Sequence, residues 1–256
     1  MCFHARAVGT AKEIENHYGV KRSNKEQAKG NEFIYHHSNG YSHDVFWCIP
    51  QQRNDHITPM MWGLLPYNKN GSDHTAFYKK AIPWGAGLNV QSERLFSNWQ
   101  YKKSALKQRC IIPLSGFYEP HTCQKPKNFK VPYYFEQINS PFVSLAGIYS
   151  ITPDNYVSFG ILTKKAQEKS KYATIHNKKN RDGENRQVVP LDKEQIHKWL
   201  SDDLDENGVF DIIENDLPEN LINAYSVSKD VFSSRINSNY PEINTKVEYP
   251  QVQIPY

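Results

Sequence analysis

Cys2 is the residue whose type and position allow the most distinctive chemistry in this sequence. It follows Met1 directly, and an initiator methionine is commonly removed when the second residue is small. Removal would leave Cys2 with a free α-amine beside its thiol, and reference pKa values of about 8 and about 8.5 make both groups partly nucleophilic at neutral pH. Such an aminothiol condenses with an aldehyde at nitrogen to form an imine, and the sulfur then closes a thiazolidine ring. The plainer alternative is a second-position cysteine without a role.

Two other side chains could move protons beside such a nucleophile. Glu119 ends an apolar segment, and the aromatic residues Phe117 and Tyr118 before it would partly desolvate its carboxyl. Desolvation raises a carboxyl pKa toward the range that is useful for general acid–base catalysis. His176 offers an imidazole between a short predicted helix and a basic loop. The alternatives are a surface glutamate and a structural histidine.

The remaining cysteines do not indicate a metal site, and no sequence motif indicates a phosphate-binding cofactor. Cys48 and Cys110 lie in apolar, β-branched segments that are typical of core strands. No pair of cysteines has the C-x-x-C spacing of a zinc site, and the sequence contains no glycine-rich phosphate loop. We therefore expect no metal and no cofactor.

The net charge of the chain is modest, but the charges are unevenly distributed. Its 256 residues carry 31 Lys and Arg against 27 Asp and Glu, which gives a net charge of +4. Residues 101–130 contain seven basic residues and one acidic residue, and residues 163–186 contain eight basic and three acidic residues. Residues 192–219 contain ten acidic residues and two basic ones. Such segregation can build a positive face that attracts phosphate backbones, whereas a chance imbalance on a solvated surface is the alternative.

The elements that position these residues are expected to form one α+β domain. A chain of 256 residues can bury a core without disulfides or metals, and 13% aromatic residues argue against disorder. Short strands along the whole chain, with helices between some of them, indicate an antiparallel or barrel-like sheet with peripheral helices. We expect the domain to cover residues 1–240, and residues 241–256, which contain three prolines, to form an extended C-terminal tail.

Capping residues, apolar periodicity and turn residues predict the individual elements. One helix is expected after Thr10, because Glu13 completes a capping-box pattern. The expected helices cover residues 11–18, 97–107, 166–171, 192–200 and 208–214. The expected strands cover residues 32–36, 44–49, 58–65, 109–119, 132–137, 142–149, 156–163 and 223–227, with the three between 132 and 163 forming an antiparallel series. Residues 21–31, 67–74 and 177–185 are expected to be polar loops.

Neither a membrane span nor a secretion signal is expected. No apolar run approaches the ~18 residues that a membrane helix needs. The N-terminal residues lack the apolar region of a signal peptide. These features predict a cytoplasmic protein that does not bind a membrane.

Six sequence blocks in a fixed order resemble one known family. They are Met-Cys at 1–2, Trp-Gly-Leu-Leu-Pro at 62–66, Asn-Val-Gln-Ser-Glu at 89–93, the run from 109 to 119 that ends in Gly-Phe-Tyr-Glu, Ile-Leu-Thr at 161–163, and Ile-His at 175–176 with a later Pro-Leu at 190–191. Together with the N-terminal cysteine they resemble the SRAP family, the SOS response-associated peptidases that shield abasic sites in single-stranded DNA. The resemblance covers the chain from Cys2 to about residue 237 and implies the SRAP fold.

The resemblance implies a role for four residues of this chain. Cys2 would be the nucleophile and, once Met1 is removed, the residue that links to DNA. Asn89 matches the asparagine that holds the Cys2 end in place. Glu119 matches the glutamate near the Cys2 amine, and His176 matches the histidine that handles protons on the opened sugar. The same groups could cleave Met1 from the chain, with the Cys2 thiol attacking the Met1 carbonyl.

The resemblance also implies a DNA-binding surface, from which this sequence departs in part. The expected pocket-lining residues are Thr163 and His4, and the expected DNA contacts are Trp62, Gly63, Gln91, Tyr101, Lys102, Lys103, Lys178 and Arg186. Family members usually read Cys-Gly-Arg, Asn-Ala-Arg and His-x-Arg-Met-Pro, whereas this chain has Cys-Phe-His at 2–4, Asn-Val-Gln at 89–91 and an insertion at 177–185. Two phosphate-contacting arginines of the family are therefore absent, and the lysines of the basic segments could compensate. Trp62 is expected to stack on a base, with a core tryptophan as the alternative.

These residues support one leading hypothesis and two rivals. The leading hypothesis is a monomeric abasic-site sensor that binds single-stranded DNA, associates with the nucleoid on damage and forms a thiazolidine cross-link through Cys2. It would be a self-processing cysteine peptidase of the SRAP type with lyase-like chemistry. The rivals are a cysteine-dependent peptidase or amidohydrolase that acts on other substrates, and a nucleic-acid-binding module without chemistry.

Overall fold

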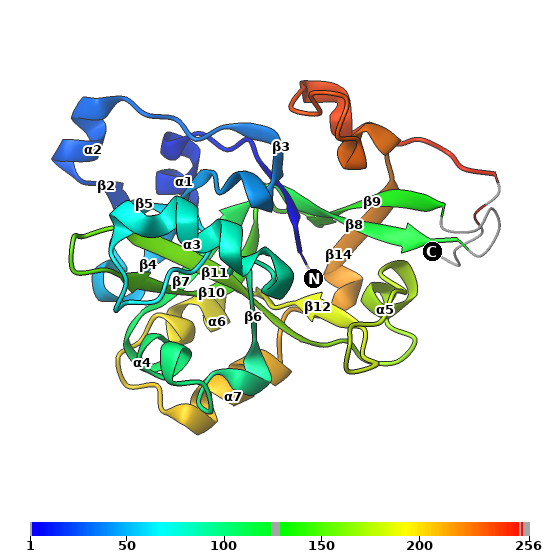
Figure 1. The fold of residues 1–256 in the computed structure, drawn as a ribbon. Coiled ribbons are helices and arrows are strands. Elements are labelled where there is room, and N and C mark those ends of the chain that lie inside the picture. Colours follow the sequence, from blue (N-terminus) through cyan, green and yellow to red (C-terminus); the bar gives the residue numbers. More distant parts are fainter. Residues whose placement is uncertain (1, 124–128, 251, 253–256) are drawn as a thin grey trace.

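Two β-sheets and the helices around them make up the part of the chain that the structure describes (Figure 1). A computed structural model describes residues 2–123, 129–250 and 252. Five strands of the larger sheet close into a barrel: β4 (Val45–Pro50), β5 (His56–Trp62), β11 (Val157–Lys165), β10 (Val143–Ile151) and β7 (Arg109–Leu114). The β5–β11 pair is parallel and closes the ring, and the other four pairs are antiparallel. The predicted α+β class with a barrel-like sheet is therefore confirmed.

Helices cover the outside of the barrel. The covering helices are α1 (Ala11–Tyr18), α4 (Trp99–Lys107), α6 (Lys193–Trp199) and α7 (Glu206–Glu214). Their apolar side chains join one core cluster with the outward-facing residues of the barrel strands. Because both faces are covered, β7 is buried at all six of its positions, which explains its continuous apolar sequence.

The second sheet is antiparallel and places the N-terminal strand in its interior. Its order is β14 (Ile222–Ser226), β9 (Lys130–Gln137), β8 (Gly116–Thr122), β1 (His4–Ala7) and β3 (Tyr35–Asn39). β1 pairs with β8 on one side and with β3 on the other. The N-terminal end of the chain therefore lies at the centre of the molecule, beside the barrel (Figure 1).

Short elements connect and flank the two sheets. The remaining strands and helices are β2 (Lys21–Arg22), α2 (Asn24–Lys29), α3 (His74–Ala81), β6 (Asn89–Gln91), α5 (Lys171–Ile175), β12 (Arg186–Val188) and β13 (Pro190–Leu191). The 3-10 turns are Gly40–Ser42, Gln51–Arg53, Gly71–Asp73, Ile82–Trp84, Ser92–Arg94, Glu219–Leu221, Lys229–Phe232 and Pro241–Asn244. β6 pairs in parallel with β11, and β12 extends the same sheet from the other side of β11.

The helix predictions are correct where capping residues signal them. Thr10 and Glu13 form the predicted capping box of α1, and Asp192 caps α6. Residues 21–31 are not a plain loop, because Ser23 caps α2 and Gly30 ends it in a left-handed conformation. The sequence analysis also missed α3, and it placed α5 several residues too early.

Each predicted strand overlaps an observed one, but β1, β2, β6, β12 and β13 were not predicted and some pairings are wrong. The segment 109–119 is two strands, β7 and β8, because the chain turns at Ser115 from the barrel into the second sheet. The predicted antiparallel series between 132 and 163 holds for β10 and β11 only. β9 pairs instead with β8 and β14, since it belongs to the second sheet.

The C-terminal segment differs from the expected extended tail. Pro241–Asn244 form a 3-10 turn whose Ile243 is fully buried in a small apolar cluster. Lys246 forms an isolated bridge with Val227, and the Tyr249 hydroxyl donates to the Val227 carbonyl at 2.8 Å. Burial of Ile243 anchors this segment to the second sheet. Residues 251 and 253–256 of the expected tail lie outside the described residues.

Candidate active site

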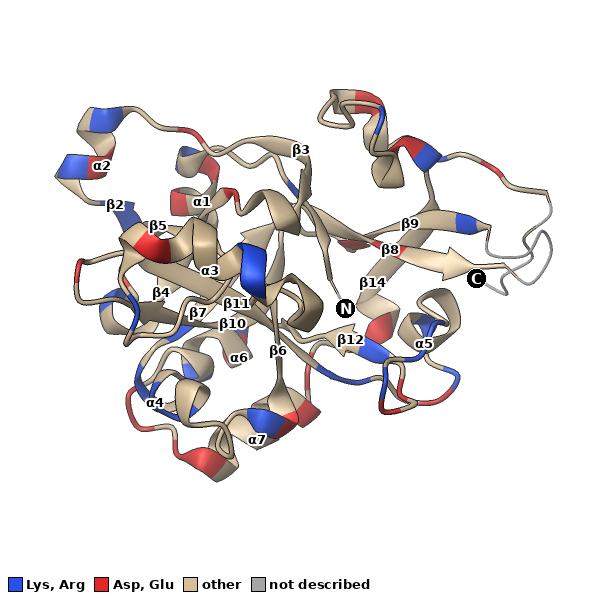
Figure 2. Cartoon of the chain, viewed as in Figure 1, with Lys and Arg blue, Asp and Glu red and all other residues tan. Residues whose placement is uncertain are grey.

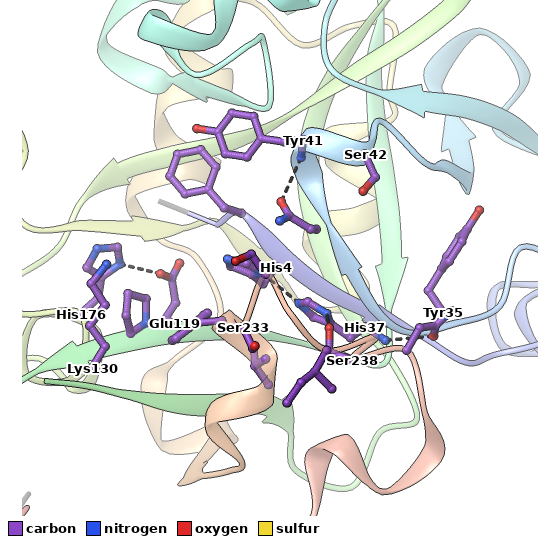
Figure 3. A pocket seen from close by; sticks show the side chains of 18 of the residues that line it. His4, Tyr35, His37, Tyr41, Ser42, Glu119, Lys130, His176, Ser233 and Ser238 are labelled. Carbon is purple, nitrogen blue, oxygen red and sulfur yellow. Dashed lines mark hydrogen bonds and ion pairs between the residues drawn. The ribbon is translucent and has the colours of Figure 1, made fainter.

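One face of the second sheet forms the floor of a pocket of about 820 Å³. β1, β3, β8 and β9 contribute its floor, and the segments 176–180 and 231–239 contribute its walls (Figure 3). Its lining includes His4, Glu119, His176, Lys178 and Arg186 among the residues that were predicted to form the site. The pocket therefore brings together side chains from both halves of the chain.

Cys2 lies directly before β1 and is buried. Its side chain is 0% exposed, and its thiol donates to the carbonyl of His4 at a distance of 3.7 Å. The Cys2 carbonyl accepts a hydrogen bond of 2.8 Å from Asn89 Nδ2. Burial, followed by the negative charge of Glu119, raises the pKa of the Cys2 thiol, so the thiol stays protonated at neutral pH. Met1 lies outside the described residues.

A tight turn and a short parallel strand place Asn89 beside Cys2. Gly87 has φ +72°, and a Cβ at this position would lie 2.6 Å from the carbonyl oxygen of Leu64, so the turn requires glycine. β6 then pairs with β11, with Asn89 opposite Ile161. The predicted role of Asn89 as the residue that holds the Cys2 end agrees with this contact, although its effect on a reaction stays a prediction.

Glu119 and His176 form an ion pair at the floor of the pocket. His176 Nδ1 lies 2.6 Å from Glu119 Oε2 (Figure 3). Tyr118 pairs with His4 across β8 and β1, so Glu119 follows directly beside the N-terminal strand. His176 ends α5, and Asn185 Nδ2 donates to its carbonyl at 2.8 Å, which fixes the turn after the helix.

The carboxyl of Glu119 is ionised although it is buried. The side chain is 4% exposed, and burial alone would raise its pKa. The positive charge of His176 and its hydrogen bond outweigh burial and hold the pKa of Glu119 below its ordinary value. The predicted rise of this pKa is therefore wrong in direction, because the sequence does not reveal that His176 packs against the carboxyl. A buried carboxylate of this kind can accept a proton and return it to a neighbouring group.

His4 lines the pocket, as predicted, and belongs to a chain of polar contacts. His4 Nδ1 lies 2.9 Å from His37 Nε2, and His37 Nδ1 lies 2.5 Å from Ser238 Oγ. The edge of His4 also packs against Phe232, with ring centroids 4.9 Å apart. The sequence analysis missed His37, Ser238 and Phe232. The signals available were two histidines at the end of the predicted strand 32–36 and directly after it, and the Ser-rich segment 226–238.

Thr163 lies behind the pocket, whereas Arg186 lines it with a guanidinium that is already paired. Thr163 is fully buried, is not among the residues that line the pocket, and has Arg186 Nη2 donating to its carbonyl at 2.8 Å. The Arg186 guanidinium also contacts both carboxylate oxygens of Glu93, at 2.6 and 2.9 Å. The contact of Arg186 with a DNA phosphate stays a prediction, and in this structure Glu93 pairs with its charge.

Trp62 and Gly63 are core residues in this structure. Trp62 is 1% exposed, and its indole Nε1 donates to the carbonyl of Leu88 at 3.0 Å. Gly63 has φ +130°, and a Cβ there would lie 2.6 Å from the ring of His43. The predicted stacking of Trp62 on a base is therefore corrected in favour of the core alternative, because Phe46 and Phe159 enclose its ring.

Four other predicted DNA contacts lie away from this pocket. Gln91 is half-buried in β6, and Tyr101 lines a second cavity of about 420 Å³ that Asn89 also lines. Lys102 and Lys103 are exposed on α4, and the Lys103 ammonium lies 5.3 Å from the centre of the Tyr67 ring. Asn89 is therefore shared between this second cavity and the contact with Cys2.

Three lysines provide positive charge at the pocket with the Glu119–His176 pair. Lys178 and Lys179 are exposed on the wall formed by segment 176–180, and Lys130 is exposed at the start of β9. Lys178 was predicted to contact DNA, and Lys179 was expected to compensate for missing arginines, whereas Lys130 was not singled out.

In Figure 2 the acidic residues of α7 and of the chain before it lie at the bottom of the view, away from the N-terminal end.

Acidification is expected to destabilise the fold through His4 and His37. Burial lowers the pKa of His4 from 6.5 to about 4 and that of His37 to about 3. Below pH 6.5 the unfolded chain therefore binds protons at these histidines that the folded chain does not bind. The stability that the neutral histidines contribute is complete above the unfolded pKa of 6.5 and is lost as the pH falls toward 4. At about pH 5 each histidine should lower the free energy of unfolding by roughly 2 kcal/mol. Denaturant unfolding at neutral pH and at about pH 5 measures this loss.

Two variants separate this effect from general acid sensitivity. His37→Gln removes one of the two titrating groups, so its loss of stability on acidification should be smaller than that of the wild type by roughly 2 kcal/mol. His197→Gln, at an exposed position of α6, should behave as the wild type does. Equal losses in the wild type and in His37→Gln would contradict the assignment.

The described residues contain no helix that is both long and apolar enough to cross a membrane.

Comparisons with known proteins agree with the resemblance seen in the sequence. The family model described as SOS response associated peptidase (SRAP) matches residues 1–234. The chain is 26% identical over 206 residues to YoqW of Bacillus subtilis (strain 168), named an abasic site processing protein, with 79% of this chain and 82% of YoqW covered. YMR114C of Saccharomyces cerevisiae carries the same descriptive name and is 23% identical over 160 residues, which cover 61% of this chain and 41% of that protein.

Solved structures share the fold. A crystal structure of a protein from Bacteroides thetaiotaomicron matches with a TM-score of 0.78 and 23% identity, over 96% of this chain and 100% of that one. A protein from Bordetella bronchiseptica matches with a TM-score of 0.66 and 18% identity, over 89% of this chain and 100% of that one. At these identities the matches establish a common architecture.

Proposed function

The chain belongs to the SOS response-associated peptidase (SRAP) family, and from this premise we propose that it processes abasic sites in DNA by capturing their aldehyde with Cys2. The names of YoqW and YMR114C support abasic-site processing as the general activity. The finer proposal is that removal of Met1 exposes the α-amine of Cys2, which then forms a thiazolidine with an abasic site in single-stranded DNA. The same side chains would assist removal of Met1.

The observation that carries the proposal is the pairing of a held N-terminal cysteine with an acid–base pair. Asn89 binds the Cys2 carbonyl at 2.8 Å, and the charge of Glu119 acts on the Cys2 thiol. Glu119 in turn contacts His176 at 2.6 Å on the pocket floor. An abasic sugar is mostly a closed hemiacetal, and opening it to the aldehyde requires both an acid and a base. One carboxylate and one imidazole in contact supply these two functions.

The proposed reaction proceeds through the amine before the thiol. The Cys2 α-amine adds to the aldehyde carbon, and loss of one water gives an imine. The thiol then adds across the C=N bond, so that sulfur bonds to carbon and the thiol proton ends on nitrogen. The raised pKa of the buried thiol supports this order, because a protonated thiol is a weak first nucleophile. These steps require no oxidant and no metal.

Positive charge at the pocket supports a nucleic-acid substrate. Lys130, Lys178 and Lys179 contribute to the lining beside Glu119 and His176. Contacts with phosphates release counterions, so binding through these lysines would weaken as the salt concentration rises. The proposal assigns to them the phosphate contacts that arginines make elsewhere in the family.

A cross-linking assay tests the proposed function directly. The protein, with loss of Met1 verified by its intact mass, is mixed with a single-stranded oligonucleotide that carries one abasic site. We expect a heat-stable slower band on a denaturing gel, because the thiazolidine survives denaturation. The matched control is the same oligonucleotide after borohydride has reduced its aldehyde to an alcohol, which should give no band. Equal bands with both oligonucleotides, or no band with either, would overturn the proposal.

A further inference from the structure

Two side chains on the floor of the pocket and one on its wall form a continuous chain of hydrogen bonds. His4 Nδ1 and His37 Nε2 are 2.9 Å apart, and His37 Nδ1 and Ser238 Oγ are 2.5 Å apart (Figure 3). The two imidazole rings are nearly parallel, with an interplanar angle of 13° and centroids 5.1 Å apart. The chain therefore joins β1, β3 and the segment 231–239, which are far apart in the sequence.

We propose that Ser238, His37 and His4 form an imidazole relay that carries protons between Glu119 and the part of the pocket that Ser238 lines. The inference rests on the proposed function, because it assigns the relay to proton exchange at the Cys2 amine. Neither the resemblance nor the comparisons assign a role to His37 or Ser238. In this scheme they are positioning residues that act through His4.

The hydrogen-bond geometry allows two arrangements of the relay, and both hold the same number of protons. In the first, His4 Nδ1–H donates to His37 Nε2 and His37 Nδ1–H donates to Ser238 Oγ, which leaves His4 Nε2 as an acceptor. In the second, Ser238 donates to His37 Nδ1 and His37 Nε2–H donates to His4 Nδ1, which leaves His4 Nε2–H as a donor. Both ring nitrogens of His37 are engaged, so its tautomer sets the tautomer of His4.

One end of the relay, His4, lies near Glu119, and the other end, Ser238, lines the pocket. Figure 3 shows His4 between Glu119 and His37, and the charge of Glu119 acts on His4. At the other end Ser238 lines the pocket, and its neighbour Asn239 accepts a 2.8 Å hydrogen bond from the backbone N–H of His36. This contact holds the segment 231–239 against β3 and keeps Ser238 on His37.

The surroundings keep both imidazoles neutral, as a relay requires. Burial lowers the pKa of His4 to about 4 and that of His37 to about 3, so each ring carries one N–H near neutral pH. The charged and titratable groups that face them are Glu119 from β8 and Lys130 from β9, while Tyr118 packs edge-on against His37. A neutral imidazole can accept a proton on one nitrogen and release one from the other.

In the proposed transfer one proton enters the relay at His4, and a different proton leaves it at Ser238. The Cys2 α-ammonium gives a proton to the Glu119 carboxylate, which passes it to His4 Nε2. His4 Nδ1–H then passes to His37 Nε2, and His37 Nδ1–H passes to Ser238 Oγ. Ser238 releases its own hydroxyl proton to water in the pocket. The reverse sequence returns a proton when the imine is hydrolysed.

Two variants interrupt the relay in different ways. His37→Gln keeps one donor and one acceptor but cannot exchange tautomers, and Ser238→Ala removes only the outer link. We expect each to slow cross-linking by at least about tenfold, since positioned proton transfer typically contributes 10²–10⁴-fold. Added imidazole should restore the rate of the variants across pH 5–8 and leave the wild-type rate unchanged. Ser144→Ala, which removes another buried serine hydroxyl that contacts Tyr18 at 2.7 Å, is the matched control and should react at the wild-type rate.

NMR of the histidine rings tests the relay independently of cross-linking. Nitrogen-15 NMR of the histidine rings should find His4 and His37 neutral at neutral pH, and Ser238→Ala should change the tautomer balance of both. A change confined to His37, or a protonated His4, would overturn the relay. Wild-type cross-linking rates in His37→Gln, without dependence on imidazole, would overturn it as well. Failure of the wild type to cross-link would instead count against the proposed function and leave the NMR result to decide the relay.

Discussion

Cys2→Ala and Cys2→Ser are both expected to eliminate the heat-stable cross-link while retaining a trappable imine. Alanine and serine are small enough for the cell's methionine aminopeptidase to remove Met1 without help from the Cys2 thiol, so each variant presents an α-amine to the aldehyde. Alanine has no group that closes a ring, and the serine hydroxyl adds to an imine far less readily than a thiol does. Borohydride should therefore trap an adduct of both variants, whereas heating without it should release the DNA. Denaturing gels with and without the reductant measure both outcomes.

An internal cysteine supplies the control for this prediction. Cys123→Ala changes a buried thiol directly after β8 and should cross-link as the wild type does. Intact mass of every variant must show that Met1 has been removed, because an acylated position 2 has no free amine. A heat-stable band of wild-type intensity from Cys2→Ala would rule out the thiazolidine.

The sequence predicts the candidate site from residues whose type and position indicate their chemistry. Cys2, Asn89, Glu119 and His176 come from four separate blocks. The structure joins them as two contacting pairs, Asn89 with Cys2 and Glu119 with His176, and the charge of Glu119 acts on the Cys2 thiol. Asn89 reaches Cys2 through the strand pairing of β6 with β11. The roles of these residues in a reaction stay predictions, whereas their proximity is a property of the fold.

The errors at the site arose where tertiary packing decides what a side chain does. An aromatic residue beside glycine is compatible with base stacking, but Trp62 fills the barrel interior against Phe46 and Phe159. The sequence likewise does not reveal that Arg186 pairs with Glu93 from another segment. The direction of the Glu119 pKa depends on His176 in the same way. A single sequence shows residue types, and the partners that neutralise or bury them are set by long-range contacts.

The fold was predictable where signals are local and less so where strands choose partners. Capping residues gave the starts of α1 and α6 correctly, because a cap acts within one helical turn. The assignment of β8 and β9 to a separate sheet depends on the turn at Ser115, and no residue pattern around it specifies which sheet the chain enters. The parallel β5–β11 contact that closes the barrel is likewise a pairing between distant segments.

Glu119→Gln is expected to slow cross-linking by about 10²–10³-fold without weakening DNA binding. Glutamine has nearly the shape of glutamate and can still accept a hydrogen bond from His176, but it cannot carry a proton from the Cys2 amine. The wild-type pKa of Glu119 lies below its ordinary value, so its carboxylate remains available throughout the neutral range. Single-turnover cross-linking rates and binding to undamaged single-stranded DNA separate the two effects.

The double variant Glu119→Gln/His176→Ala shows whether the ion pair acts as one unit. Groups that act together give non-additive losses, so the double variant should react about as slowly as the slower of the two single variants. Glu136→Gln, on the neighbouring strand β9 and hydrogen-bonded to Asn223, is the matched control and should retain the wild-type rate. Losses that multiply would instead indicate that Glu119 and His176 serve separate steps, with the 2.6 Å contact between them contributing to structure alone.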